Sequence, residues 1–75
     1  MPTPQERIAA VAGKLDTLAE TYGRETDYYR DRMKEEPDNK WVEIFMHSNE
    51  ERRQAYAAAA DLVRRDLLPS GAIDE

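Results

Sequence analysis

The sequence predicts an all-α fold, an antiparallel hairpin of two long helices. Apolar side chains recur every three or four residues along two long stretches, which is the period of a helix and excludes a half-buried strand. The stretches are separated by a short break at residues 36–39, and a short connection between helices makes them antiparallel neighbours. With 75 residues and no cysteine, the chain is expected to form one small domain over residues 1–75.

The first helix is expected over about residues 4–35. Thr3 is a favourable N-cap, Pro4 suits the first helical position, and Glu6 completes a capping box. Pro37 disfavours helix in the residue before it and so marks the end. The expected apolar seam consists of Ile8, Val11, Leu15, Leu18, Tyr22, Tyr29 and Met33.

The second helix is expected over about residues 40–68, with Asp38 or Asn39 as its N-cap. Proline and glycine follow directly after it, and residues 70–75 are expected to form a disordered tail. The expected seam consists of Trp41, Phe45, Tyr56, Ala59, Val63 and Leu67, with Trp41 and Phe45 as core residues.

Two interpretations are open at Ser48. Ser48 and Glu51 fit a second capping box, so the helix would break and restart there. Alternatively the helix is continuous and its polar residues form a layer between the helices. Continuity is favoured, because neither glycine nor proline interrupts this stretch.

Both apolar seams are interrupted by polar residues, at the same distance from the loop. Glu25 interrupts the first seam, and Ser48, Asn49 and Arg52 interrupt the second; Tyr22 lies at the same height. These five residues are the expected polar layer, with an ion pair between Glu25 and Arg52 and the Tyr22 ring beside the guanidinium. The layer would fix the register of the helices, hold an ion or ligand, or lie exposed if the bundle is open there.

Five residues are candidate metal ligands. Glu43 and His47 lie one turn apart, Glu50 and Glu51 follow a turn later, and Glu25 adds a carboxylate from the first helix. One histidine among carboxylates is more typical of a solvated helix face, so no metal site is assigned. No catalytic residue is assigned either, because a single His without Cys cannot complete a nucleophilic set.

Several residues follow the pattern of a known family: Asp27-Tyr28-Tyr29, Arg32, Ile44, His47, Glu51, Ala57 and Arg64-Arg65. This stretch resembles the encapsulated-ferritin-like proteins, short helical hairpins that dimerise into a ferritin-type four-helix bundle. The resemblance implies a dimer, and iron bound by a first-helix Glu and a second-helix E-x-x-H. Tyr22 stands at the position of the first Glu, and Arg52 and Ala55 stand at the E-x-x-H positions, so the family's iron ligands are absent.

Charge and hydropathy limit the kinds of partner and the cellular location that the sequence predicts. A formal net charge of −5 argues against nucleic acids and anionic membranes, whose affinity depends on clustered Lys and Arg. The longest small-residue run, residues 57–60, is too short to span a bilayer, and the N-terminus lacks the apolar core of a secretory signal. A cytoplasmic location is therefore expected.

The expected function is that of a small acidic, non-catalytic helical protein that self-associates as a homodimer or larger oligomer. It would act by protein–protein binding in a regulatory or structural role, without a cofactor. One alternative is a ferritin-like iron-binding or ferroxidase protein with displaced ligands such as Glu25, Glu50 and Glu51. Another is a small acidic inhibitor, similar to an antitoxin, that masks a basic protein surface.

Overall fold

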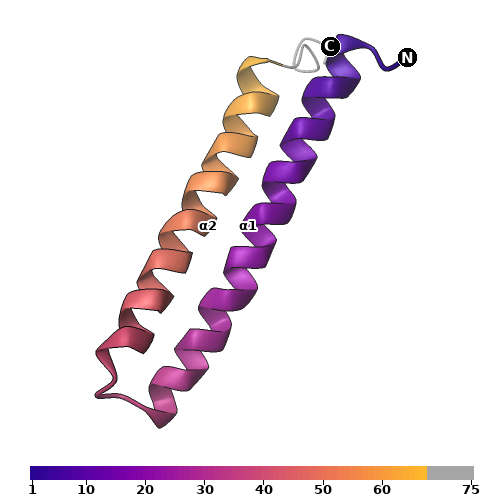
Figure 1. Cartoon of the computed structure of the whole chain (residues 1–75). Coiled ribbons are helices and arrows are strands. Elements are labelled where there is room, and N and C mark those ends of the chain that lie inside the picture. Colours follow the sequence, from indigo (N-terminus) through magenta and orange to yellow (C-terminus); the bar gives the residue numbers. More distant parts are fainter. Residues whose placement is uncertain (68–75) are drawn as a thin grey trace.

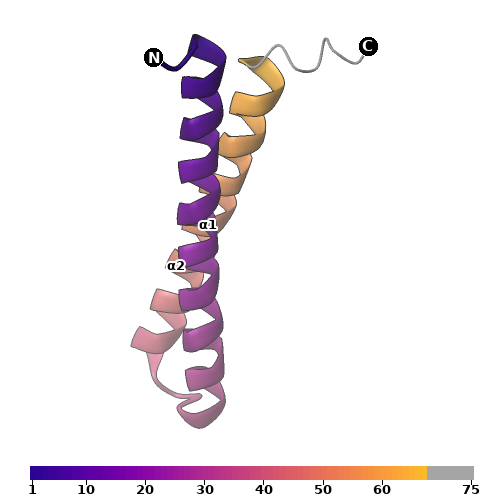
Figure 2. The same cartoon turned by 90° about the vertical axis from the view of Figure 1, so that its right-hand side faces the viewer.

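The computed structural model describes residues 1–67 as two helices packed side by side. Helix α1 runs over Pro4–Glu35 and α2 over Lys40–Asp66, and they are antiparallel neighbours along their length (Figures 1 and 2). The predicted all-α hairpin is confirmed. Helix α2 continues through Ser48 without a restart. Residues 68–75, on which the expected tail falls, lie outside the described residues.

The N-terminus of α1 is held by its capping box. The Thr3 hydroxyl accepts a hydrogen bond from the backbone N–H of Glu6 at 3.1 Å, and the Glu6 carboxylate accepts one from the backbone N–H of Thr3 at 2.8 Å. Pro4 occupies the first turn, where its missing N–H has no helical partner to lose. Such a cap stabilises a helix by about 1 kcal/mol.

Side chains at the end of α1 and at the start of α2 hold the loop between the helices. The Asn39 side chain caps α2 by accepting from the backbone N–H of Trp41 at 3.0 Å, and its amide donates to Glu36 at 2.9 Å. The Arg32 guanidinium also donates to Glu36. The Asn39 amide and then this guanidinium lower the pKa of Glu36 below its ordinary value. The turn therefore holds a defined geometry at the closed end of the hairpin.

The residues between the helices form an inner seam with alternating four- and three-residue spacing, as in coiled coils. The inner seam consists of Ile8, Ala12, Leu15, Ala19, Tyr22, Thr26, Tyr29 and Met33 on α1, and Val42, Met46, Asn49, Arg53, Tyr56, Ala60 and Val63 on α2; all are buried or half-buried. Its fully buried apolar residues are small, with Ala12 and Ala60 at 0% exposure. Small side chains at these positions allow the two helices to approach closely.

The expected seam was partly wrong, because several of its members lie outside this contact. Val11 is 51% exposed, Phe45 45% and Trp41 67%, so the prediction that Trp41 and Phe45 are core residues is not met within the hairpin. Each helix carries two neighbouring rows of suitable spacing. Close approach of the helices is made possible by the alanines in the contact, Ala12, Ala19 and Ala60, whereas several large apolar residues are left outside it.

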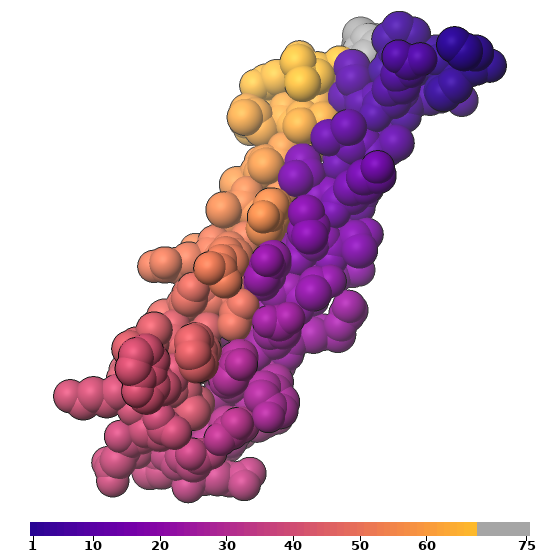
Figure 3. All heavy atoms as spheres, viewed as in Figure 1, coloured from indigo at the N-terminus to yellow at the C-terminus, as the bar shows by residue number. Residues whose placement is uncertain are grey.

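The hairpin is a single layer of helices. Its principal extents are 52 × 25 × 14 Å, so the molecule is long and thin. Figure 3 shows the helices as two adjacent columns with nothing covering the side in view. Neither α1 nor α2 has a segment long and apolar enough to cross a bilayer.

Candidate interaction surface

One side of the hairpin carries a second row of residues, here called the outer seam, which includes the exposed Val11, Leu18, Trp41 and Phe45. The outer seam consists of Val11, Leu18, Glu25 and Arg32 on α1, and Trp41, Phe45, Ser48, Arg52, Ala55, Ala59 and Leu62 on α2. Two contacts join the helices on this side. The Phe45 and Tyr29 ring centroids lie 5.5 Å apart, and the Arg52 guanidinium lies 5.7 Å from the Tyr22 ring centroid.

The opposite side is closed by polar contacts. Arg64 donates to Asp16 across the two helices at 3.3 Å, which lowers the pKa of Asp16. Arg53 donates to Glu50 at 2.9 Å, and its aliphatic stem crosses Gly23, where a Cβ would lie 3.1 Å from the Arg53 Cδ. Hydrogen bonds, first from Arg53 and then from Gln54, lower the pKa of Glu50 to about 2. The two sides therefore differ: the outer seam is open and exposes large apolar side chains beside the charges of Glu25 and Arg52, whereas the other side is covered by ion pairs.

The expected polar layer is present in part. Asn49 is buried, Tyr22 and Ser48 are half-buried, and the predicted contact of the Arg52 guanidinium with the Tyr22 ring is found. The Tyr22 ring also stacks on Tyr56, with centroids 5.6 Å apart.

The ion pair expected between Glu25 and Arg52 is absent from the ion pairs of residues 1–67, and both side chains are exposed. Both residues belong to the outer seam and not to the space between the helices. Their charges therefore stay in solvent and need no partner within the hairpin.

The polar residues that do lie between the helices satisfy their own hydrogen bonds. Thr26, which the sequence reasoning missed, is 1% exposed, and its hydroxyl donates to the Tyr22 carbonyl at 2.8 Å. The buried Asn49 amide donates to the Phe45 carbonyl at 2.8 Å. Such bonds to the carbonyl one turn back remove the need for a partner from the other helix. The seven-residue spacing of Ala19, Thr26 and Met33 is the signal that could have identified Thr26.

The candidate metal ligands do not converge. The His47 Nε2 lies 3.9 Å from a Glu43 carboxylate oxygen, and both side chains are exposed. Glu50 is held by Arg53 on the other side, and Glu25 and Glu51 are exposed. Within residues 1–67, no three His, Cys, Asp or Glu side chains are grouped closely enough to hold a metal ion. The arrangement gives no support for a metal centre in a single hairpin.

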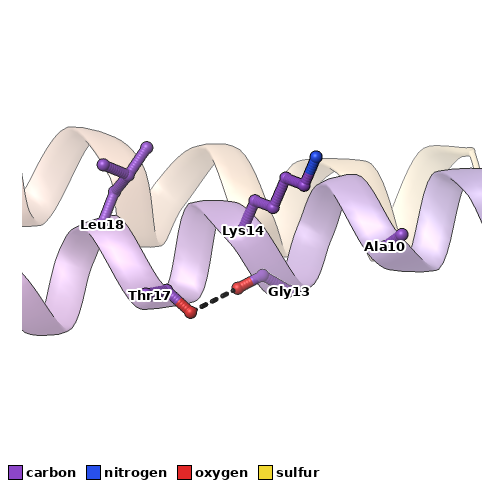
Figure 4. Close-up of a pocket in the computed structure, with 5 residues that line it drawn as sticks. All are labelled: Ala10, Gly13, Lys14, Thr17 and Leu18. Carbon is purple, nitrogen blue, oxygen red and sulfur yellow. Dashed lines mark hydrogen bonds between the residues drawn. The ribbon is translucent and has the colours of Figure 1, made fainter.

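A shallow groove lies on α1 beside the outer seam. Its lining comes from this helix alone, with α2 behind it in Figure 4: Ala10, Gly13, Lys14, Thr17 and Leu18. The Thr17 hydroxyl is already bonded to the Gly13 carbonyl at 3.1 Å. With no buried polar group facing it, the groove lacks the chemistry to recognise a small molecule, and its apolar lining adds to the surface around Leu18.

Comparison with known proteins finds no protein-family model, curated protein or solved structure that matches the chain. The ferritin-like resemblance is thus an untested prediction. The feature of the hairpin that bears most directly on function is its outer seam.

Proposed function

We propose that this chain is a non-catalytic helical protein that acts through self-association, two copies joining by their outer seams into a four-helix bundle. The bundle is the unit that serves a regulatory or structural role by binding other proteins. One observation carries this proposal: large apolar side chains gather on one open side, with Val11, Leu18, Phe45 and Trp41 between 39% and 67% exposed.

The small core of a single hairpin supports the same proposal. The buried apolar residues are three alanines and Val42. Each Å² of apolar surface removed from water contributes about 25 cal/mol, so these side chains stabilise the hairpin little. Small domains with few buried apolar residues often add another source of stability, such as oligomerisation, disulfides or a metal. The chain has no cysteine, and a second copy provides apolar burial directly.

A second copy also fits the shape of the surface. Two long antiparallel helices with an open apolar side form half of a four-helix bundle, in which each helix contacts two neighbours. A two-fold dimer uses the same patch on both chains, so one outer seam is sufficient to build the interface. The opposite side, closed by Asp16–Arg64 and Glu50–Arg53, is left for solvent or for other proteins.

Sedimentation equilibrium at micromolar concentration tests the proposal. The wild-type mass should be twice that of the 8.7 kDa chain. Combined Val11→Glu and Leu18→Glu should shift the protein towards monomer, because burying unpaired carboxylates is unfavourable. Ala9→Glu is the matched control, since Ala9 is exposed but outside the outer seam.

Two results would contradict the proposal. A wild-type protein that is monomeric and folds cooperatively would exclude self-association as the source of its stability. Stoichiometric iron in the purified protein would contradict the non-metal function and favour the ferritin-like alternative.

A further inference from the structure

We infer that reciprocal contacts between Glu25 of each chain and Arg52 of the partner subunit fix the geometry of the dimer. The two-fold axis then runs parallel to the helices. This inference rests on the proposed self-association and specifies its partner, a second copy, and the arrangement of that copy.

The first observation is that these two charges have no counter-charge within the hairpin. Arg64, Arg53 and Arg32 each pair with a carboxylate. Glu25 and Arg52 take part in no ion pair formed among residues 1–67, and both are exposed in the outer seam. Each is therefore available to a chain that covers this side.

The second observation is that both charges lie at nearly the same height. Arg52 reaches the Tyr22 ring, with its guanidinium 5.7 Å from the centroid. Glu25 follows Tyr22 by three residues, a rise of about 4.5 Å along α1. The outer seam thus carries one acid on α1 and one base on α2, side by side near the middle of an otherwise largely apolar stretch.

This charge pattern is complementary to itself in only one face-to-face arrangement. With the axis parallel to the helices, α1 of one chain lies on α2 of the other, and heights are preserved. Glu25 then meets the partner's Arg52, and the contact occurs twice by symmetry. With the axis perpendicular to the helices, α1 lies on α1 and α2 on α2, so the unlike charges do not meet.

Side-chain size favours the same arrangement. Leu18 lies one turn before Tyr22, which stacks on Tyr56. On the antiparallel helix the same height corresponds to Ala55 and Ala59. When α1 lies on the partner's α2, Leu18 faces small residues, which is the large-against-small packing that fills a helical core.

The charges contribute specificity more than affinity. Burying a charge is costly unless it is paired with an opposite charge. Other registers of the two chains would bury Glu25 and Arg52 without partners and are therefore disfavoured. Polar residues at core positions of helical bundles select register and partner in the same way. The Tyr22 ring of the same chain makes a cation–π contact with the Arg52 guanidinium and so helps to hold it in place.

Mixing two charge-reversed chains tests this inference. Glu25→Arg alone and Arg52→Glu alone each place like charges opposite one another twice, so each should raise the dimer dissociation constant by about tenfold or more. An equimolar mixture restores both unlike pairs. It should recover the wild-type constant to within about threefold, and native mass spectrometry should show heterodimer above the statistical proportion.

The mixture separates contacts between chains from contacts within one chain. If Glu25 and Arg52 paired inside a chain, each variant in the mixture would keep its like charges and no rescue would occur. Glu20→Arg and Arg24→Glu, at exposed positions outside the outer seam, form the matched control pair and should mix at random. A dimeric wild type without preferential heterodimer overturns this inference and leaves the proposed function standing. A monomeric wild type overturns the proposed function itself.

Discussion

Two glycines in the interior of α1 should respond differently to alanine. Alanine is favoured over glycine inside a helix by about 1 kcal/mol. A Cβ on Gly13 would have nothing within 4 Å, so Gly13→Ala should raise the free energy of unfolding by this full amount. A Cβ on Gly23 would lie 3.1 Å from the Arg53 Cδ, and Arg53 is held by its hydrogen bonds to Glu50. Gly23→Ala should therefore gain less than about 0.5 kcal/mol.

A double-mutant cycle by urea denaturation separates the two effects. Protein concentration must be the same throughout, because self-association contributes to stability. In an Arg53→Ala background, Gly23→Ala should recover the gain of about 1 kcal/mol, while Gly13→Ala should be additive with Arg53→Ala. Equal gains from the two glycine substitutions in the wild-type background would refute the packing of Arg53 over Gly23.

Acid and concentration provide two further tests. Because the pKa of Glu50 falls from 4.5 to about 2 on folding, its stabilising effect is complete above about pH 4.5 and is lost as the pH decreases towards 2. Urea midpoints should follow this decline, and Glu50→Gln should make it smaller, leaving the part that comes from Asp16 and Glu36. An unchanged profile would contradict the contact with Arg53. Trp41, the single tryptophan and 67% exposed in the hairpin, should show blue-shifted emission as protein concentration rises. The shift should be lost when Val11 and Leu18 are replaced by glutamate, and a shift that persists would place Trp41 outside the dimer interface.

The parts of the fold that local signals determine could be predicted from the sequence. Thr3 and Glu6 specify the start of α1, Pro37 prevents α1 from continuing, and Asn39 caps α2. Each of these depends on residues within one helical turn. Counting from the loop also placed Tyr22 at the height of Arg52, and the contact between the ring and the guanidinium is found.

The choice of contact face could not be predicted in this way. Each helix has two rows with seam-like spacing, and the predicted seam took members from both. Most of its α1 residues belong to the inner seam, whereas Val11, Leu18, Trp41 and Phe45 belong to the outer seam. The actual contact includes Ala12, Ala19 and Ala60, which allow the helices to approach closely. How closely two helices approach depends on both of them, so the pattern of one helix does not show it. Thr26 was missed because a sequence pattern treats threonine as polar. Its hydroxyl donates to the Tyr22 carbonyl of its own helix, so the side chain can pack in the contact as an apolar residue does.

The order of contacts along the hairpin has a consequence for how the chain folds. Tyr29 and Phe45 meet next to the loop, whereas Asp16 and Arg64 meet across 48 residues. Closing a short loop costs less entropy than closing a long one, so the helices should join first at the turn and then close progressively towards the open end. Substitutions near Tyr29 should then slow folding, and those at Asp16 should mainly accelerate unfolding. The open end, which contains both the start of α1 and the end of α2, is thus the first part of the molecule to separate and the last to form.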